Sequence, residues 1–156
     1  MEPNIGISAD NTKNIIDILN RLLANEYVLY TKTRNYHWNV TGMQFNDLHK
    51  FFESEYGELD GIIDEVAERC RTLGGKTVAT LSEFIGNSKV KEQPDTYPEA
   101  QTMLRNLLID HEIIIQALRQ DLETCVKLGD AGTSDFLTGL MEQHEKMAWM
   151  IRAFLE

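Results

Sequence analysis

Hydrophobic residues recur every three or four positions through most of the chain, which is the spacing of an amphipathic α-helix. In residues 11–38 the apolar positions at this spacing are Ile15, Ile18, Leu19, Leu22, Leu23, Tyr27 and Tyr30. The pattern stops over residues 39–44 and resumes as far as residue 73, where Gly74 and Gly75 end it. Glycine directly after a periodic segment is typical of a helix C-terminus. We therefore predict two long helices joined by a short loop.

The second half of the chain carries another pair of periodic segments. A third helix is predicted from about residue 96 to Gly129, and a fourth from Thr133 or Ser134 to near the C-terminus. Between the two pairs lies a long connection, residues 76–97, in which TVATLSEFIG is expected to form a short helix.

No segment alternates between apolar and polar residues as a β-strand does. Four long helices in two hairpins, joined by a long crossover, predict an all-α fold, a ferritin-like four-helix bundle. The short extra helix lies in the crossover linker between helices 2 and 3. We expect a single ferritin-like domain over residues 1–156, with residues 1–10 as a short N-terminal tail.

Composition narrows the functional classes. The formal net charge of −10 argues against nucleic acid as a partner, because binding to phosphates requires a basic patch, and it suits the attraction of cations. No apolar run is long enough to span a membrane, and the first fifteen residues do not resemble a signal peptide. Cys70 and Cys125 are most simply reduced thiols, so we expect a cytoplasmic protein without a membrane partner.

The stretch HKFFESEYGELDGIIDEVAE, residues 49–68, contains two pairs of possible metal ligands. His49 and Glu53 are spaced i,i+4, and so are Asp64 and Glu68, so each pair lies on one face of a helix. Eleven residues separate Glu53 from Asp64, close to three whole turns, so all four side chains point the same way. The two pairs are nevertheless about 22 Å apart along the helix, from its rise of about 1.5 Å per residue. No single metal site can include both pairs.

A second copy of the chain could bring the two kinds of pair together in one metal site. Gly57 and Gly61 flank the midpoint between the pairs, and glycine costs a helix about 1 kcal/mol relative to alanine. Close approach of another backbone is a good reason for two glycines there. If a second copy crosses antiparallel at this point, the first pair of one chain lies beside the second pair of the other, and a two-fold axis creates two equivalent sites. The alternative is a solvated acidic helix face.

His37 adds a further possible ligand, near the end of the first helix and one short loop before His49. The hairpin can bring its imidazole over the start of the second helix, giving two histidines and three carboxylates, a set suited to Fe(II) or Zn(II). A lone histidine at this point would otherwise be a hydrogen-bonded core residue. Ordinary di-iron bundles carry Glu-x-x-His motifs. The residues three positions before the four histidines are Arg34, Asn46, Leu108 and Met141, so that type of intra-subunit site is not expected.

The segment HWNVTGMQFNDLHKFFE, followed by DEVAERCRTLGG, resembles the Dps proteins, the twelve-subunit mini-ferritins. The similarity extends over essentially the whole chain. It implies a ferroxidase centre across a dimer interface, with His37, His49 and Glu53 from one chain and Asp64 and Glu68 from its partner. Family members usually have aspartate at the position of Glu53. The extra methylene of this chain should move the carboxylate by about a bond length.

The resemblance also implies a function. We expect a ferroxidase that oxidises Fe(II), preferably with hydrogen peroxide, stores the Fe(III) as mineral in a dodecameric cage and protects against oxidative stress. Zn(II) is a possible non-redox occupant of the same ligands. Asp130 and Asp135 flank the turn before the fourth helix. They suit capping and turn roles, and the resemblance offers them as the lining of three-fold pores that admit iron.

Two other functions remain open at this point, DNA compaction and a purely structural or recognition cage with an incidental metal site. Some Dps proteins compact DNA with lysine-rich tails, which this acidic chain lacks, so DNA binding is not expected. Five further acidic residues and histidines of the last two helices could face each other across these helices, but hydrogen-bonded or exposed roles are expected instead. They are Asp110, His111, Glu142, His144 and Glu145.

Overall fold

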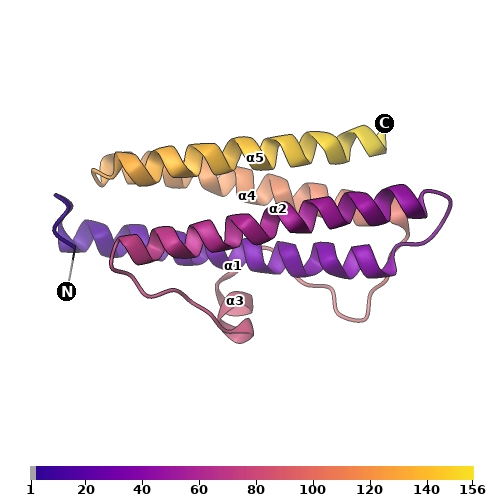
Figure 1. The fold of residues 1–156 in the computed structure, drawn as a ribbon, viewed down its shortest axis with the longest axis horizontal. Coiled ribbons are helices and arrows are strands. Elements are labelled where there is room, and N and C mark those ends of the chain that lie inside the picture. Colours follow the sequence, from indigo (N-terminus) through magenta and orange to yellow (C-terminus); the bar gives the residue numbers. More distant parts are fainter. Residues whose placement is uncertain (1–2) are drawn as a thin grey trace.

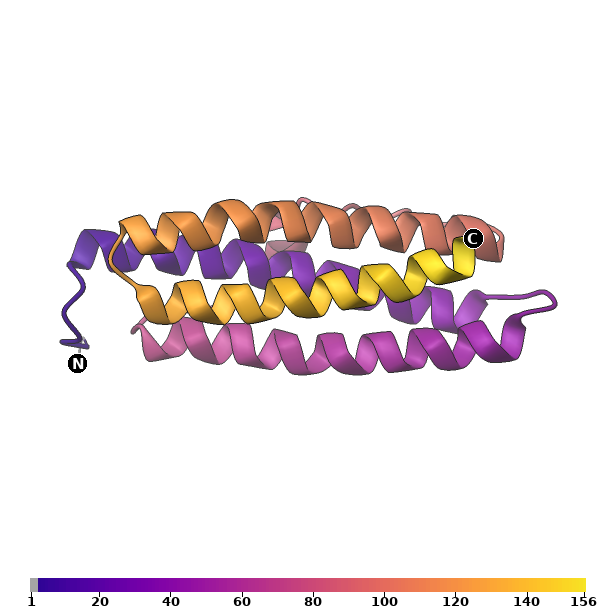
Figure 2. The same ribbon diagram turned by 90° about the horizontal axis from the view of Figure 1, so that it is seen from above.

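The computed structural model describes residues 3–156, which contain five α-helices and no β-strand. The helices are α1 (Ala9–Asn39), α2 (Phe45–Thr72), α3 (Leu81–Asn87), α4 (Ala100–Lys127) and α5 (Ala131–Leu155). The four long helices lie side by side as a bundle (Figures 1 and 2). The short α3 lies outside the bundle and packs on α1 (Figure 1). The predicted four-helix bundle with an extra helix in the crossover is therefore confirmed.

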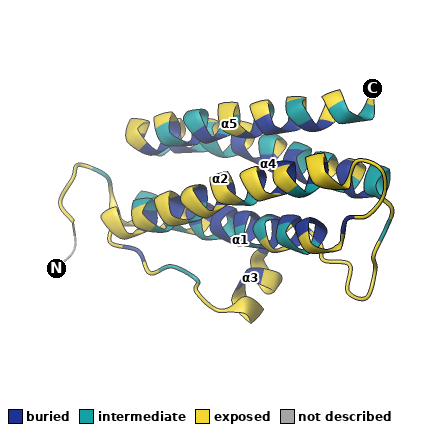
Figure 3. Cartoon of the chain, turned by 45° about the vertical axis from the view of Figure 1, so that its right-hand side comes forward, coloured by how far each residue is buried: buried dark blue, intermediate teal, exposed yellow. Residues whose placement is uncertain are grey.

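The bundle consists of two helical hairpins that pack on each other. α1 packs along α2 and α4 packs along α5, while the contacts α1–α4 and α2–α5 join the hairpins. The crossover from α2 to α4 runs along the outside of α1 and includes α3 (Figure 1). Each long helix buries the face that it turns to the other three and exposes the opposite face (Figure 3). This arrangement gives α2 one long outward face.

Two helices begin at different residues from those predicted, and side-chain caps explain both differences. α4 begins at residue 100 because the carboxylate of Glu99 accepts hydrogen bonds from the backbone N–H groups of Gln101 and Thr102. α5 begins at residue 131 because Asp130 caps it, with the Thr133 N–H donating to Oδ1 at 2.9 Å. Periodicity alone does not contain this information, since capping residues lie outside the repeating pattern.

The first helix begins at Ala9, inside the segment expected to be a tail. Ser8 caps it by accepting a hydrogen bond from the backbone N–H of Asn11 at 3.3 Å. Among the described residues, no helix has the length and apolar character needed to cross a membrane.

Candidate metal site on the outward face of α2

The loop between α1 and α2 brings two imidazoles into face-to-face contact. His37 lies in the last turn of α1 and His49 in the second turn of α2. Their ring centroids are 3.8 Å apart, with an interplanar angle of 20°. His37 is 7% exposed and His49 is half-buried. The hairpin thus places His37 over the start of α2.

Each imidazole is held by the backbone of the other helix. His37 Nδ1–H donates to the carbonyl oxygen of His49 at 2.7 Å, and His49 Nδ1–H donates to the carbonyl oxygen of His37 at 2.8 Å. A carbonyl oxygen only accepts, so Nδ1 carries the proton in both neutral rings and Nε2 keeps its lone pair. A backbone hydrogen bond at one ring nitrogen is the usual support for metal binding at the other. Both histidines therefore have the tautomer that a metal ion requires at Nε2.

The three predicted carboxylate ligands lie on the exposed face of α2. Glu53, Asp64 and Glu68 are all exposed to solvent. Across residues 3–156, no group of three or more His, Cys, Asp or Glu side chains is arranged to hold a metal ion. One chain brings His37 and His49 together and leaves the second pair of carboxylates farther along the same helix.

The two glycines between these pairs face open space. A Cβ atom added at Gly57 or at Gly61 would have no neighbour within 4 Å in the same chain. No contact among the described residues therefore requires glycine at either position. At both positions a second helix could approach the backbone of α2 without meeting a side chain of that residue.

Asp130 and Asp135, the residues weighed as a possible iron-entry pore, lie in different environments. Asp130 is 4% exposed, and its carboxylate accepts from the N–H and the hydroxyl of Thr133 and pairs with Arg69 at 3.2 Å. Burial acts to raise the pKa of Asp130, but these hydrogen bonds and the Arg69 charge outweigh burial and lower the pKa below its ordinary value. Asp135 is exposed on α5. Of the two, Asp135 has the carboxylate that faces solvent.

A second set of histidines and carboxylates is buried in the bundle core, with one residue from each long helix. Glu26, Glu55, His111 and His144 are each at most 2% exposed. His144 Nε2 lies 3.0 Å from Glu26 Oε1, and the two Nδ1 atoms of His144 and His111 are 2.9 Å apart. His111 Nε2 lies 3.7 Å from Glu55 Oε2. Contacts at hydrogen-bond distance thus join Glu26, His144 and His111, and Glu55 lies beside His111 without a hydrogen bond at Oε2 among the described residues.

Burial shifts the pKa values of two of these four side chains. It raises the pKa of Glu55 to about 8, with a smaller contribution from the nearby negative charge of Glu58. Burial also lowers the pKa of His111 well below its ordinary value, and His144 adds to this effect. At neutral pH Glu55 is therefore a carboxylic acid that can donate a proton, and His111 is a neutral imidazole.

Sequence reasoning missed Glu26 and Glu55, although the sequence contains a signal for both. Each occupies an apolar position of the helical pattern: Leu22 and Leu29 flank Glu26 at helical spacing, and Leu59 follows Glu55 by one turn. A carboxylate at a core position requires a partner. The expectation that His111 and His144 are hydrogen-bonded is confirmed.

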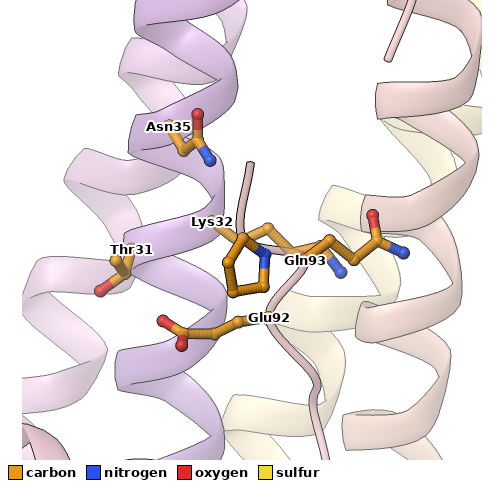
Figure 4. Close-up of a pocket in the computed structure, with 6 residues that line it drawn as sticks. Thr31, Lys32, Asn35, Glu92 and Gln93 are labelled. Atoms are coloured by element: carbon orange, nitrogen blue, oxygen red, sulfur yellow. The ribbon is translucent and has the colours of Figure 1, made fainter. Parts of the chain in front are cut away.

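A hollow of about 220 Å³ lies between α1 and the crossover and contains none of the predicted ligands. Its lining is polar and comes from Thr31, Lys32, Asn35, Glu92, Gln93 and Pro94 (Figure 4). The Lys32 ammonium is already paired with Asp110 at 2.6 Å and donates to the carbonyl oxygen of Lys91 at 3.2 Å. The Lys32 ammonium is therefore already engaged by contacts within the fold, and Glu92 is the other charged residue of the lining.

Comparison with known proteins agrees with this fold. A family model for the ferritin-like domain matches residues 16–156. A Dps protein of Vibrio cholerae O1, described as a member of a broad superfamily of ferritin-like diiron-carboxylate proteins, superposes with a TM-score of 0.93 at 34% identity. The superposition covers 99% of this chain and 97% of the other. The architecture is therefore that of a ferritin-like protein.

Sequence relatives identify the group within that class. A low temperature-induced protein of Nostoc sp., described as uncharacterized, is 44% identical over 154 residues, which is 98% of this chain and 86% of the relative. DNA protection during starvation protein 2 of Bacillus anthracis is 42% identical over 144 residues, covering 92% and 97% of the two chains. The chain belongs to the Dps family of ferritin-like proteins, as its HWNVTGMQFNDLHKFFE segment predicts.

Proposed function

We propose that this protein is the subunit of an iron-oxidising and iron-storing cage. Fe(II) is the substrate, and it binds at a dinuclear site shared between two subunits related by a two-fold axis. The observation that carries the proposal is the division of ligands along α2. The first pair, His49 and Glu53, lies at the start of α2, where His49 stacks on His37. The second pair, Asp64 and Glu68, lies farther along the exposed face of α2, and two glycines with open space around them lie between the pairs.

In the proposed site, His37, His49 and Glu53 come from one subunit. Asp64 and Glu68 of the partner subunit complete the ligand set. Neutral Nε2 atoms and carboxylate oxygens suit Fe(II). The free Nε2 atoms at the His37–His49 contact support this assignment. The antiparallel crossing at the glycines would produce a second, equivalent site on the other side of the axis.

The proposed oxidant is hydrogen peroxide. Two Fe(II) ions give one electron each to one peroxide molecule, which takes up two protons and becomes two molecules of water. Because both electrons arrive together, no hydroxyl radical is released. The Fe(III) produced is stored as mineral inside an assembly of twelve subunits, and exposed Asp135 is a candidate for the iron-entry pore.

DNA binding is not part of the proposal, although relatives carry DNA protection in their names. A net charge of −10 opposes contact with a polyanion at physiological ionic strength. The protection that we propose acts through removal of Fe(II) and peroxide.

The test is a stopped-flow titration of the anaerobic, Fe(II)-loaded protein with hydrogen peroxide. Wild type should oxidise two Fe(II) per peroxide rapidly, and Asp64→Ala/Glu68→Ala should lose the fast phase. Glu58→Ala/Glu65→Ala is the matched control, because it removes the same charge from exposed positions of the same helix. Equal slow traces from wild type and the Asp64/Glu68 variant would overturn the proposal and favour a structural cage.

A further inference from the structure

Four aromatic rings form one column through the candidate site. The Phe45 ring stacks on His49 with centroids 5.2 Å apart and an interplanar angle of 28°. His49 stacks on His37 at 3.8 Å, and the Tyr56 ring meets His37 edge to face at 5.3 Å and 80°. The two imidazoles thus lie between two larger rings. Phe45 and Tyr56 close the two ends of the column.

The Tyr56 end of the column is fixed by a cation. The Arg34 guanidinium carbon lies 4.8 Å from the centroid of the Tyr56 ring and 5.1 Å from that of Trp38. Arg34 also donates a hydrogen bond to the Tyr30 hydroxyl at 2.7 Å. A guanidinium over aromatic faces is attracted by the negative charge of each ring face. This end of the column is therefore held by several contacts.

Phe45 lies at the other end of the column, and core packing does not account for its position. It is the first residue of α2 and remains 46% exposed despite its size. Among its aromatic neighbours in the described chain, the imidazole of His49 is the ring on which it stacks. A large apolar side chain left nearly half in water, with its flat face against a histidine, points to a role at that histidine.

Each imidazole is attached to the backbone of the other helix by a hydrogen bond at Nδ1. A ring held by a single hydrogen bond can still rock about that bond, which would move its Nε2 lone pair. Contact on both faces removes that freedom, since each ring of the pair would have to push its neighbour. Groups that orient a metal-binding histidine typically change metal affinity by about 10- to 100-fold when they are removed.

We infer that Phe45 is a positioning residue, which clamps the stacked His49–His37 pair so that both Nε2 atoms keep the direction needed for metal binding. This inference rests on the proposed function, because it assigns Phe45 to the same iron site. Phe45 acts through its flat face and contributes no ligand atom.

The test compares Phe45→Leu with Phe45→Tyr in the full-length protein. Leucine keeps an apolar side chain but has no flat face, whereas tyrosine keeps the ring. Co(II), titrated anaerobically and followed by its visible absorption, is the probe. Phe45→Leu should weaken Co(II) binding about tenfold or more, and Phe45→Tyr should restore it. Met43→Ala is the control, since Met43 lies two residues before Phe45 in the loop that precedes α2 and is fully exposed.

A second readout needs no metal. In the metal-free wild type, nitrogen NMR of the imidazoles should give separate protonated Nδ1 and unprotonated Nε2 signals for His37 and His49. Phe45→Leu should move these signals toward an average of the two tautomers. If wild type binds Co(II) and Phe45→Leu matches it in affinity and in NMR signals, the positioning role is overturned while the proposed function stands. If wild type neither binds Co(II) through His37 and His49 nor oxidises Fe(II), the proposed function itself fails.

Discussion

Replacing Glu55 by glutamine should change how the stability of the fold depends on pH. Burial raises the pKa of Glu55 from 4.5 to about 8, so the folded protein keeps a proton that the unfolded chain releases above 4.5. The free energy of unfolding must therefore fall as pH rises through this window. The contribution of the bound proton is fully present below pH 4.5 and is lost as pH rises through about 8.

The size of the effect follows from the width of this window. Each pH unit in which the folded state alone holds the proton changes the free energy of unfolding by about 1.4 kcal/mol. The whole window, from 4.5 to about 8, corresponds to about 5 kcal/mol. Glutamine is isosteric and stays neutral at every pH. The variant should therefore lose this part of the pH dependence.

The assay is urea unfolding of wild type and Glu55→Gln at pH 6, 7 and 8, at one protein concentration, because assembly contributes to apparent stability. Because half of the folded molecules have already lost the proton at pH 8, the difference in unfolding free energy should change by about 2.3 kcal/mol in favour of the variant between pH 6 and pH 8. Glu65→Gln, an exposed position of the same helix, is the control and should run parallel to wild type. Parallel curves for Glu55→Gln would refute the assignment of a protonated Glu55.

Two further changes test the buried polar contacts. Asp130→Ala removes the cap of α5 and should cost about 1–2 kcal/mol of unfolding free energy, whereas exposed Asp135→Ala should change it by less than about 0.5 kcal/mol; equal losses in urea unfolding would contradict the capping role. Lys32→Met leaves the Asp110 carboxylate buried without its partner and should cost about 3–5 kcal/mol. The double variant Lys32→Met/Asp110→Leu should recover most of that loss, and failure to recover would show that the ion pair is itself stabilising.

The long helices could be predicted because their apolar spacing is local information. The same is true of the two pairs of possible metal ligands in α2. The i,i+4 spacing within each pair, and the three whole turns between Glu53 and Asp64, place both pairs on one face of the helix. The proximity of His37 to the start of α2 also follows from a short loop between consecutive helices. These features depend only on residues near each other in the chain.

Contacts between distant segments could not be predicted in the same way. Pairing of Glu26 with His144 spans 118 positions and requires the two helices to meet at one level of the bundle. The cap that Asp130 forms at the Thr133 N–H joins residues three positions apart, so local sequence could suggest it. The pairing of the same carboxylate with Arg69 spans 61 positions and depends on how α2 packs against the start of α5.

The bundle contains two sets of histidines and carboxylates, and the availability of nitrogen lone pairs separates them. In the core, both ring nitrogens of His144 are engaged, Nδ1 with His111 and Nε2 with Glu26. At the outward face, His37 and His49 each use Nδ1 on a backbone carbonyl and keep Nε2. A metal ion entering the core would have to displace hydrogen bonds that join the helices, at a cost in stability. A metal ion at the outward face displaces none of these, because the neighbouring carboxylates are exposed to water. The same residue types therefore stabilise the fold in the core and, under the proposed function, are available to bind iron where the end of α1 meets the start of α2.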